Sequence, residues 1–278
     1  MKAGLVSRPD KKEALNLVHD IREHLEERGV EVLMETETAL EMELPGENTD
    51  LGEMNADLMI TVGGDGTILR TAMQMLEPST PILGVNMGSR GFLTEVMPQE
   101  IHQALDKVIE GNYALEECIK LSSRNTDLDR AFPDSLNEVL VASPLPSKAI
   151  DGRLIIDDKH VLDIQCDGII AATPVGSTAY NLSAGGSIIS PVLDSIILTA
   201  ICPYSYFRSI VVPRDSKIAI ELLKPGAEGL IIIDGRDYTA TKPLSRIEVW
   251  VSDHKARFIR FKSFYERLER RLVLQKTK

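Results

Sequence analysis

A chain of 278 residues that is 43% hydrophobic and 26% charged has the composition of a globular protein and is long enough for one large domain or two. Its net charge of −11 argues against nucleic-acid or membrane partners, because a polyanionic surface would be repelled, and no run approaches the roughly 18 apolar residues of a membrane span. The three cysteines, Cys118, Cys166 and Cys202, lie far apart without a C-x-x-C motif, which argues against a disulfide framework and favours a cytoplasmic setting.

Strands and helices alternate through the first third of the chain. The apolar patterns predict strands at 3–7, 30–36, 56–62 and 81–86, and helices at 11–29, 67–76 and 98–111. This β-α-β order is typical of a parallel sheet covered by helices on both faces.

The pattern changes after about residue 112. Strand-like runs then follow one another at 114–123, 135–143, 152–165, 195–202, 209–213, 217–223, 229–235, 246–252 and 256–261. Such short strands, separated by Pro, Gly and Asp, predict a largely antiparallel β domain. The last predicted element is an amphipathic helix that packs with Phe264 and Tyr265 and leaves basic residues such as Arg267 in solvent.

The stretch TVGGDGTILR, residues 61–70, joins a predicted strand to a helix through a glycine-rich loop. Such a loop can bind an anion through free backbone N–H groups, but Asp65 at its centre would repel a phosphate. Two roles favour a carboxylate there: holding Mg²⁺ between phosphates, or accepting the proton of an attacking hydroxyl. Alternatively, Asp65 only caps the helix that begins near Thr67.

A second glycine loop, GVNMGSRGF at 84–92, follows the next strand, so both loops are expected at the carboxyl edge of the sheet, where open α/β sheets bind ligands. Residues 167–191, DGIIAATPVGSTAYNLSAGGSIISP, concentrate hydroxyl, phenol and amide groups that suit a neutral polar ligand such as a nucleoside. Asn137 and Glu138 begin a predicted strand and Asp234 ends one, positions that strand caps and turns also explain.

Together these segments resemble the ATP-dependent NAD kinase family, with GGDGT, GVNMGSRGF, NE, the 167–191 stretch, ICPYSYFRSIVVP and DGR in that order. GGDGT occurs in similar form in diacylglycerol and sphingosine kinases and phosphofructokinases, whereas Thr-Pro-x-Gly-Ser-Thr-Ala-Tyr separates this family from them. The resemblance implies a Rossmann-like α/β domain over 1–111, onto which a C-terminal helix over 260–278 packs back. It also implies a sandwich-like, β-rich NAD-binding domain over 112–259.

The implied activity is that of NAD kinase (EC 2.7.1.23), which transfers the γ-phosphoryl of ATP, or of polyphosphate, to the 2′-hydroxyl of the adenosine ribose of NAD. Asp65 would be the catalytic base, and Mg²⁺ or a similar ion would accompany the nucleotide, without metal ligands that the sequence identifies. The nucleotide- and substrate-binding residues would be Gly63, Gly64, Gly66, Thr67, Phe92, Asn137, Glu138, Asp167, Thr178, Ala179, Tyr180, Ser183 and Asp234.

Among these residues, Asn137 and Glu138 would bind the ribose and adenine, and Asp167 would reach the nicotinamide end across the interface of a homodimer or homotetramer. The chain departs from the family at Tyr204, where histidine is common, and at Arg236, where glutamine is frequent.

Two other functions remain open. One is a lipid or sugar kinase of the same superfamily, and the other is a non-catalytic regulator that binds the dinucleotide.

Overall fold

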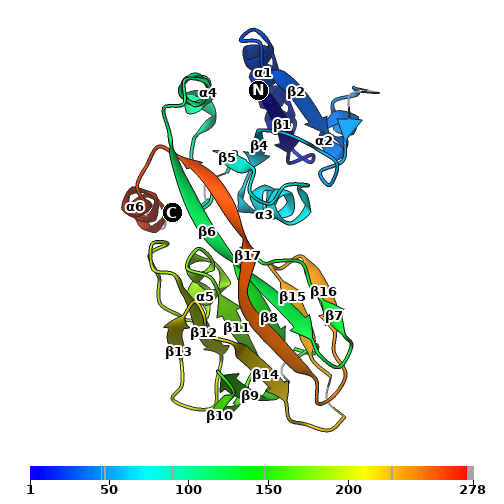
Figure 1. The fold of residues 1–278 in the computed structure, drawn as a ribbon, viewed down its shortest axis with the longest axis vertical. Coiled ribbons are helices and arrows are strands. Elements are labelled where there is room, and N and C mark those ends of the chain that lie inside the picture. The colour runs from blue at the N-terminus through cyan, green and yellow to red at the C-terminus, as the bar shows by residue number, and fades with distance from the viewer. Residues whose placement is uncertain (45, 47, 89–90, 147, 227, 274–278) are drawn as a thin grey trace. The chain divides into compact units, whose positions relative to one another are not determined.

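The computed structural model describes residues 1–44, 46, 48–88, 91–146, 148–226 and 228–273 (Figure 1). The chain forms two compact units: unit 1 comprises Met1–Glu117 and Ala256–Lys278, and unit 2 comprises Cys118–Lys255. The chain passes from one unit to the other within strands β6 (Ala114–Asn125) and β17 (Arg246–Arg260), which pair with each other and run side by side in Figure 1. Unit 2 is therefore an insertion between two segments of unit 1.

Unit 1 is built on a parallel sheet with the strand order β3-β2-β1-β4-β5-β17. Its other strands are β1 (Lys2–Ser7), β2 (Glu31–Glu35), β3 (Asn48–Thr49), β4 (Leu58–Gly63) and β5 (Pro81–Asn86). Every residue of β4 is buried, as expected of a central strand covered on both faces. The predicted parallel sheet is confirmed.

The helices of unit 1 are α1 (Lys12–Glu26), α2 (Thr36–Glu41), α3 (Asp65–Gln74), α4 (Ile101–Ile109), with the short η1 (Pro98–Glu100) before it, and α6 (Phe264–Val273). Buried residues of α1 and α4, such as Ile21 and Leu105, pack with Leu5 and Ile60 of the sheet in one core. Burying such side chains contributes about 1.5–3 kcal/mol each. Helix α3 contacts β1, β4 and β5, and this position places Asp65 at the carboxyl end of the sheet.

Helix α6 differs from the prediction in two side chains. Arg267, expected in solvent, is buried and forms an ion pair with Glu116, 2.7 Å from Arg267 Nη2 to Glu116 Oε1. Tyr265, expected on the packed face, is exposed. The helical pattern places Arg267 on the polar face. It does not show that Glu116, on another segment of the chain, pairs with this arginine. Residues 274–278 of the predicted helix lie outside the described residues.

Unit 2 contains two antiparallel sheets. One has the strand order β13-β12-β11-β8-β15-β16. In the other, β10, β9, β14 and β17 pair in that order, β6 pairs with β17, and β7 pairs with β6. The strands are β7 (Arg130–Ala131), β8 (Glu138–Ala142), β9 (Ile150–Ile156), β10 (Lys159–Cys166), β11 (Gly168–Ala172), β12 (Ser195–Ile201), β13 (Ser209–Pro213), β14 (Ile218–Leu222), β15 (Leu230–Ile233) and β16 (Asp237–Ala240). Between β11 and β12 lie the short helices η2 (Gly176–Thr178) and α5 (Tyr180–Ser183).

The two sheets of unit 2 pack closely. A Cβ atom added to Gly152 of β9 would lie 3.0 Å from Ile169 Cδ1 of β11, in the other sheet. This close approach is typical of a β-sandwich, and the predicted fold class, an α/β unit followed by a β-rich unit, is confirmed.

Three elements differ from the prediction. Helix α2 follows β2 directly, where a longer strand was expected; the Glu35 side chain accepts a hydrogen bond from Thr38 N and starts the helix. The predicted strands 246–252 and 256–261 form one strand, β17. Part of the polar stretch 167–191 is the buried strand β11. Among the described residues, no helix is both long and apolar enough to cross a membrane.

Candidate active site

Asp65 stands where β4 ends and α3 begins. The strand ends at Gly63, Gly64 is the N-cap, and Asp65 is the first helical residue, with Gly66 and Thr67 completing the first turn. The positive end of the helix dipole therefore lies at this glycine loop. Strand β5 is the neighbour of β4, so the loop after β5 lies at the same edge of the sheet, as predicted.

The Asp65 carboxylate joins the two glycine loops. The backbone N–H of Phe92 donates to Oδ1 and Oδ2 at 3.1 and 2.9 Å, and that of Leu93 donates to Oδ1 at 3.0 Å. The N-cap of α3 is Gly64, and the hydrogen bonds described for the Asp65 carboxylate go to Phe92 and Leu93 rather than to the first turn of the helix. Asp65 is half-buried, and its oxygens are held in a fixed orientation by backbone groups far along the chain.

Glycines allow this approach of the two loops. A Cβ atom on Gly91 would lie 3.2 Å from Asp65 Oδ1 and would also overlap the Thr94 hydroxyl. A Cβ on Gly63 would lie 3.0 Å from Thr67 Cβ. Ser89 and Arg90 of the GVNMGSRGF motif lie outside the described residues.

In unit 2, the carboxylate of Asp234 holds the start of β8. It accepts backbone hydrogen bonds from Leu136 at 2.7 Å, Asn137 at 2.8 Å and Glu138 at 2.9 Å. Asp234 and Gly235 have φ of 48° and 65°, and Arg236 N donates to Ile233 O, so these two residues are the centre of a β-turn that joins β15 to β16. The turn that the sequence suggested is confirmed, and the same aspartate also fixes the backbone of Asn137 and Glu138.

Glu138 is buried beside this negative charge. Burial, and next the charge of Asp234, raise the pKa of Glu138 to about 8, against a backbone hydrogen bond from Tyr180 that lowers it. Its Oε2 has no hydrogen-bond partner among the described residues. At neutral pH Glu138 is therefore a protonated acid that can donate as well as accept a hydrogen bond.

Lys120 of β6 completes this buried cluster, and the sequence analysis missed it. Burial lowers the pKa of Lys120, while the charges of Asp134 and Asp234 oppose that shift. Burial also raises the pKa of Asp234, and its backbone donors oppose that shift. The lysine at a buried position of a strand was the available signal, because a lysine is rarely buried without an acidic partner.

Many polar groups of residues 173–189 stabilise the loop itself. The Thr173 hydroxyl donates to Leu136 O at 2.6 Å, and the Ser177 hydroxyl accepts from Ile189 N at 2.8 Å. The Asn181 amide donates to Ser177 O at 2.8 Å and accepts from the Thr199 hydroxyl at 2.6 Å. These contacts assign Asn181 a structural role.

The predicted ligand-binding residues of this region are placed differently. The buried Thr178 hydroxyl donates to Val175 O at 3.0 Å, and Ala179 is half-buried. Tyr180 and Ser183, the first and last residues of α5, are exposed, as is Asp167 between β10 and β11. Within unit 2, Tyr180 lies next to Glu138 through the backbone hydrogen bond described above.

Gly176 is the tightest point of this arrangement. A Cβ atom there would lie 2.7 Å from Asn137 Cα and overlap the Asn137 carbonyl. We expect Gly176→Ala to lower the free energy of unfolding by about 1–3 kcal/mol, because the backbone of Asn137 must shift. Denaturant unfolding measures this loss. The control is Gly52→Ala in unit 1, whose Cβ would lie 3.7 Å from Gln74 O in ordinary contact; equal stabilities of the two variants would contradict the expectation.

The described residues contain no group of three or more His, Cys, Asp or Glu side chains arranged to hold a metal ion. These residues do not fit a metal site built by the protein alone.

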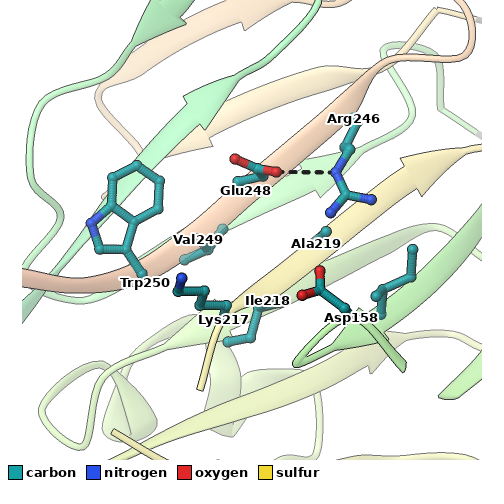
Figure 2. Close-up of a pocket in the computed structure, with 9 residues that line it drawn as sticks. Asp158, Lys217, Ile218, Ala219, Arg246, Glu248, Val249 and Trp250 are labelled. Atoms are coloured by element: carbon teal, nitrogen blue, oxygen red, sulfur yellow. Dashed lines mark hydrogen bonds and ion pairs between the residues drawn. The ribbon is translucent and has the colours of Figure 1, made fainter. Parts of the chain in front are cut away.

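A cavity of about 420 Å³ lies on the second sheet of unit 2, where Figure 2 shows Trp250 and Lys217 with the Arg246–Glu248 ion pair. None of the predicted site residues lines this cavity.

Family models match both parts of the chain. Residues 3–113 match the ATP-NAD kinase N-terminal domain, and residues 136–261 match the ATP-NAD kinase C-terminal domain. The chain is 37% identical to the NAD kinase of Methanosphaera stadtmanae, covering 99% of this chain and 100% of that protein. It is 38% identical to the NAD kinase of Thermococcus kodakarensis, covering 94% of each.

Solved structures agree with these matches. An NAD kinase from Archaeoglobus fulgidus, solved in complex with ATP, matches with a TM-score of 0.82 and 29% identity over 99% of each chain. Yeast NADH kinase, solved with NADH, matches with a TM-score of 0.88 over 100% of this chain and 89% of that one. At 23% identity, the second likeness shows the fold alone.

Proposed function

Because this chain belongs to the NAD kinase family, we propose that it makes NADP from NAD and ATP, with Asp65 as the general base. The observation that carries the proposal is the Asp65 carboxylate, held by the Phe92 and Leu93 amides at the end of β4. A carboxylate at a phosphate-binding loop costs electrostatic free energy, which a role in accepting a proton explains.

The reaction is an in-line phosphoryl transfer. The 2′-oxygen of the adenosine ribose bonds to the γ-phosphorus of ATP, and the bond from that phosphorus to the β–γ bridging oxygen breaks, which releases ADP. The hydroxyl proton passes to an oxygen of Asp65 and then to solvent. Backbone N–H groups around Gly63, Gly64, Gly66 and Thr67, at the positive end of α3, would hold phosphate groups.

We assign the acceptor site to the start of β8 and the helix α5. Oε2 of protonated Glu138, which has no hydrogen-bond partner among the described residues, can bind a ribose hydroxyl or an adenine nitrogen, next to Asn137 in the chain. Thr178, Ala179, Tyr180 and Ser183 would contact the nucleoside. Asp234 would act by holding Asn137 and Glu138 in place.

A divalent ion such as Mg²⁺ would be held chiefly by the phosphates of ATP, since the described residues offer no ready group of ligands.

A homodimer or homotetramer is proposed. The exposure of Asp167 supports it, because a residue that reaches a second subunit must lie at the surface of its own subunit. The free cysteines support a cytoplasmic location. We also propose domain bounds of 1–111 and 112–259, with the helix 260–278 belonging to the first domain.

The direct test is NADP formation by the purified protein with NAD, Mg²⁺ and either ATP or polyphosphate. We expect NADP with ATP, and the second reaction shows whether polyphosphate replaces it. Diacylglycerol and fructose 6-phosphate serve as control acceptors, and neither should be phosphorylated. Binding of NAD without any NADP from either donor would favour a non-catalytic regulator, and phosphorylation of a control acceptor would favour another kinase of the superfamily.

A further inference from the structure

Unit 1 buries a group of charged side chains that the proposed reaction does not use. Glu95, Arg260 and Arg267 are each less than a tenth exposed, and Glu116 is mostly buried. Glu95 Oε1 accepts backbone hydrogen bonds from Phe261 at 2.7 Å and Lys262 at 2.8 Å. Buried charges are costly unless they are paired, so a network of this size points to a specific role.

Arg260 lies at the centre of this network. Its Nη1 donates to the carbonyl oxygen of Leu93 at 2.7 Å and lies 3.4 Å from Glu95 Oε2, and its Nε donates to Glu116 Oε2 at 2.7 Å. The guanidinium also lies over the ring of Phe258, 4.7 Å from its centroid. These contacts fix the guanidinium in one orientation, with one N–H aimed at a backbone carbonyl.

Leu93 is therefore held on both sides. Its C=O accepts from Arg260, and its N–H donates to Asp65 Oδ1 at 3.0 Å. The neighbouring N–H of Phe92 donates to the same carboxylate. One short segment thus connects the Arg260 guanidinium to the proposed base, and a shift of that segment would turn the Asp65 oxygens.

Helix α6 supports the other side of the network. Arg267 Nη2 donates to both oxygens of Glu116, at 2.7 and 2.9 Å, and Arg267 Nη1 donates to Lys262 O at 2.9 Å. The ring of Phe264 meets that of Phe92 edge to face, with centroids 5.6 Å apart. The docked helix thus holds Glu116, and Glu116 in turn holds Arg260.

We propose that Arg260 is a positioning residue for the phosphoryl transfer, which orients the Asp65 carboxylate through the backbone of Leu93 and is itself held by Glu95, Glu116 and helix α6. The inference rests on the proposed role of Asp65 as the base. Arginine suits the position because its planar fork binds a carbonyl and two carboxylates at once, which a lysine ammonium on a flexible stem does not reproduce.

The test replaces Arg260 by lysine, which keeps the buried charge but loses the fork. We expect Arg260→Lys to lower kcat at least ~10-fold, since a small misplacement of a catalytic group is costly, and to change the KM for NAD less than about twofold. The matched control is Arg257→Lys in the same strand, where a half-buried arginine has its Nη2 3.0 Å from Glu117 Oε1; this variant should keep the parent's kcat.

Hydrogen exchange gives a readout that does not depend on activity. The Phe92 and Leu93 amides should exchange faster in ligand-free Arg260→Lys than in the parent or Arg257→Lys, because the segment that carries them is no longer held through the Leu93 carbonyl. If Arg260→Lys does not fold, Glu116→Gln tests the same step, since it weakens one contact of the guanidinium and keeps a hydrogen-bonding group. A folded Glu116→Gln should show the same loss in kcat and the same local exchange.

The Asp65→Asn variant separates this inference from the proposed function. If Asp65→Asn loses turnover while Arg260→Lys keeps the kcat and amide exchange of the parent, Arg260 has no positioning role. If Asp65→Asn itself turns over normally, the assignment of the base fails and the inference fails with it. A fall in kcat with equal exchange at Phe92 and Leu93 would also overturn the route through Leu93.

Discussion

Replacement of Asp65 by asparagine is expected to lower kcat at least ~100-fold while NAD affinity stays close to that of the parent. Asparagine has nearly the same shape and keeps one oxygen that can accept the Leu93 N–H, but it cannot take up the proton of the 2′-hydroxyl. The loss should therefore be in the chemical step. Initial rates of NADP formation and calorimetric titration with NAD measure the two quantities separately.

The matched control for this experiment is Asp57→Asn. Asp57 is an exposed aspartate just before the same strand, β4, and its carboxylate accepts a hydrogen bond only from the backbone N–H of Lys2 among the described residues. Its variant should keep the parent's kcat. Near-normal turnover in Asp65→Asn would remove the proposed base, and a loss of NAD binding of the same size as the loss in turnover would place Asp65 in the acceptor site instead.

The free energy of unfolding is expected to fall as the pH rises from about 5 to about 8. Glu138 contributes to this fall, and the Glu138→Gln variant should lack that contribution. The folded protein holds a proton on Glu138 up to its raised pKa of about 8, whereas the unfolded chain releases that proton near the ordinary value of 4.5. Between these values folding takes up a proton, so the free energy of unfolding decreases with pH. Glutamine cannot ionise. Across this pH range we therefore expect the free energy of unfolding of Glu138→Gln to rise by a few kcal/mol relative to that of the parent.

Urea unfolding at pH 5, 6.5 and 8 measures this difference. The exposed Glu77 provides a control, since Glu77→Gln should follow the parent at each pH. Glu138→Gln should also keep measurable NAD affinity at pH 7, because a primary amide donates and accepts hydrogen bonds as the protonated acid does. Unfolding free energies that run parallel for the parent and Glu138→Gln would show that Glu138 is ionised at neutral pH in the folded protein.

The local pattern of the sequence located Asp65 but did not determine its contacts. A glycine loop between a strand and a helix predicts an aspartate that either caps the helix or faces a ligand, and both alternatives use the same residues. The choice between them depends on Phe92 and Leu93, which reach Asp65 only after β5 pairs with β4. The spacing predicted a glycine loop with an aspartate at its centre, whereas the orientation of the carboxylate depends on the tertiary structure.

The charged residues that support the site were harder to predict. Glu138 was recognised at the start of a strand, but its raised pKa comes from burial and from Asp234, which lies far along the chain. Arg260 stands within the predicted strand 256–261, and nothing in its local spacing distinguishes a buried ion pair from an exposed one. The fold follows from short-range patterns of hydrophobicity, whereas these charges depend on pairs brought together by the whole fold.

The insertion of unit 2 between two segments of unit 1 has a consequence for synthesis of the chain. Unit 2, Cys118–Lys255, is one continuous segment that is synthesised in full before unit 1 is complete, because unit 1 lacks its strand next to β5 until Ala256 and the following residues appear. Until then Glu95 has neither Arg260 nor the Phe261 and Lys262 amides to pair with. The contacts that hold Leu93, and through it the Asp65 carboxylate, therefore form only after all of unit 2 has been synthesised.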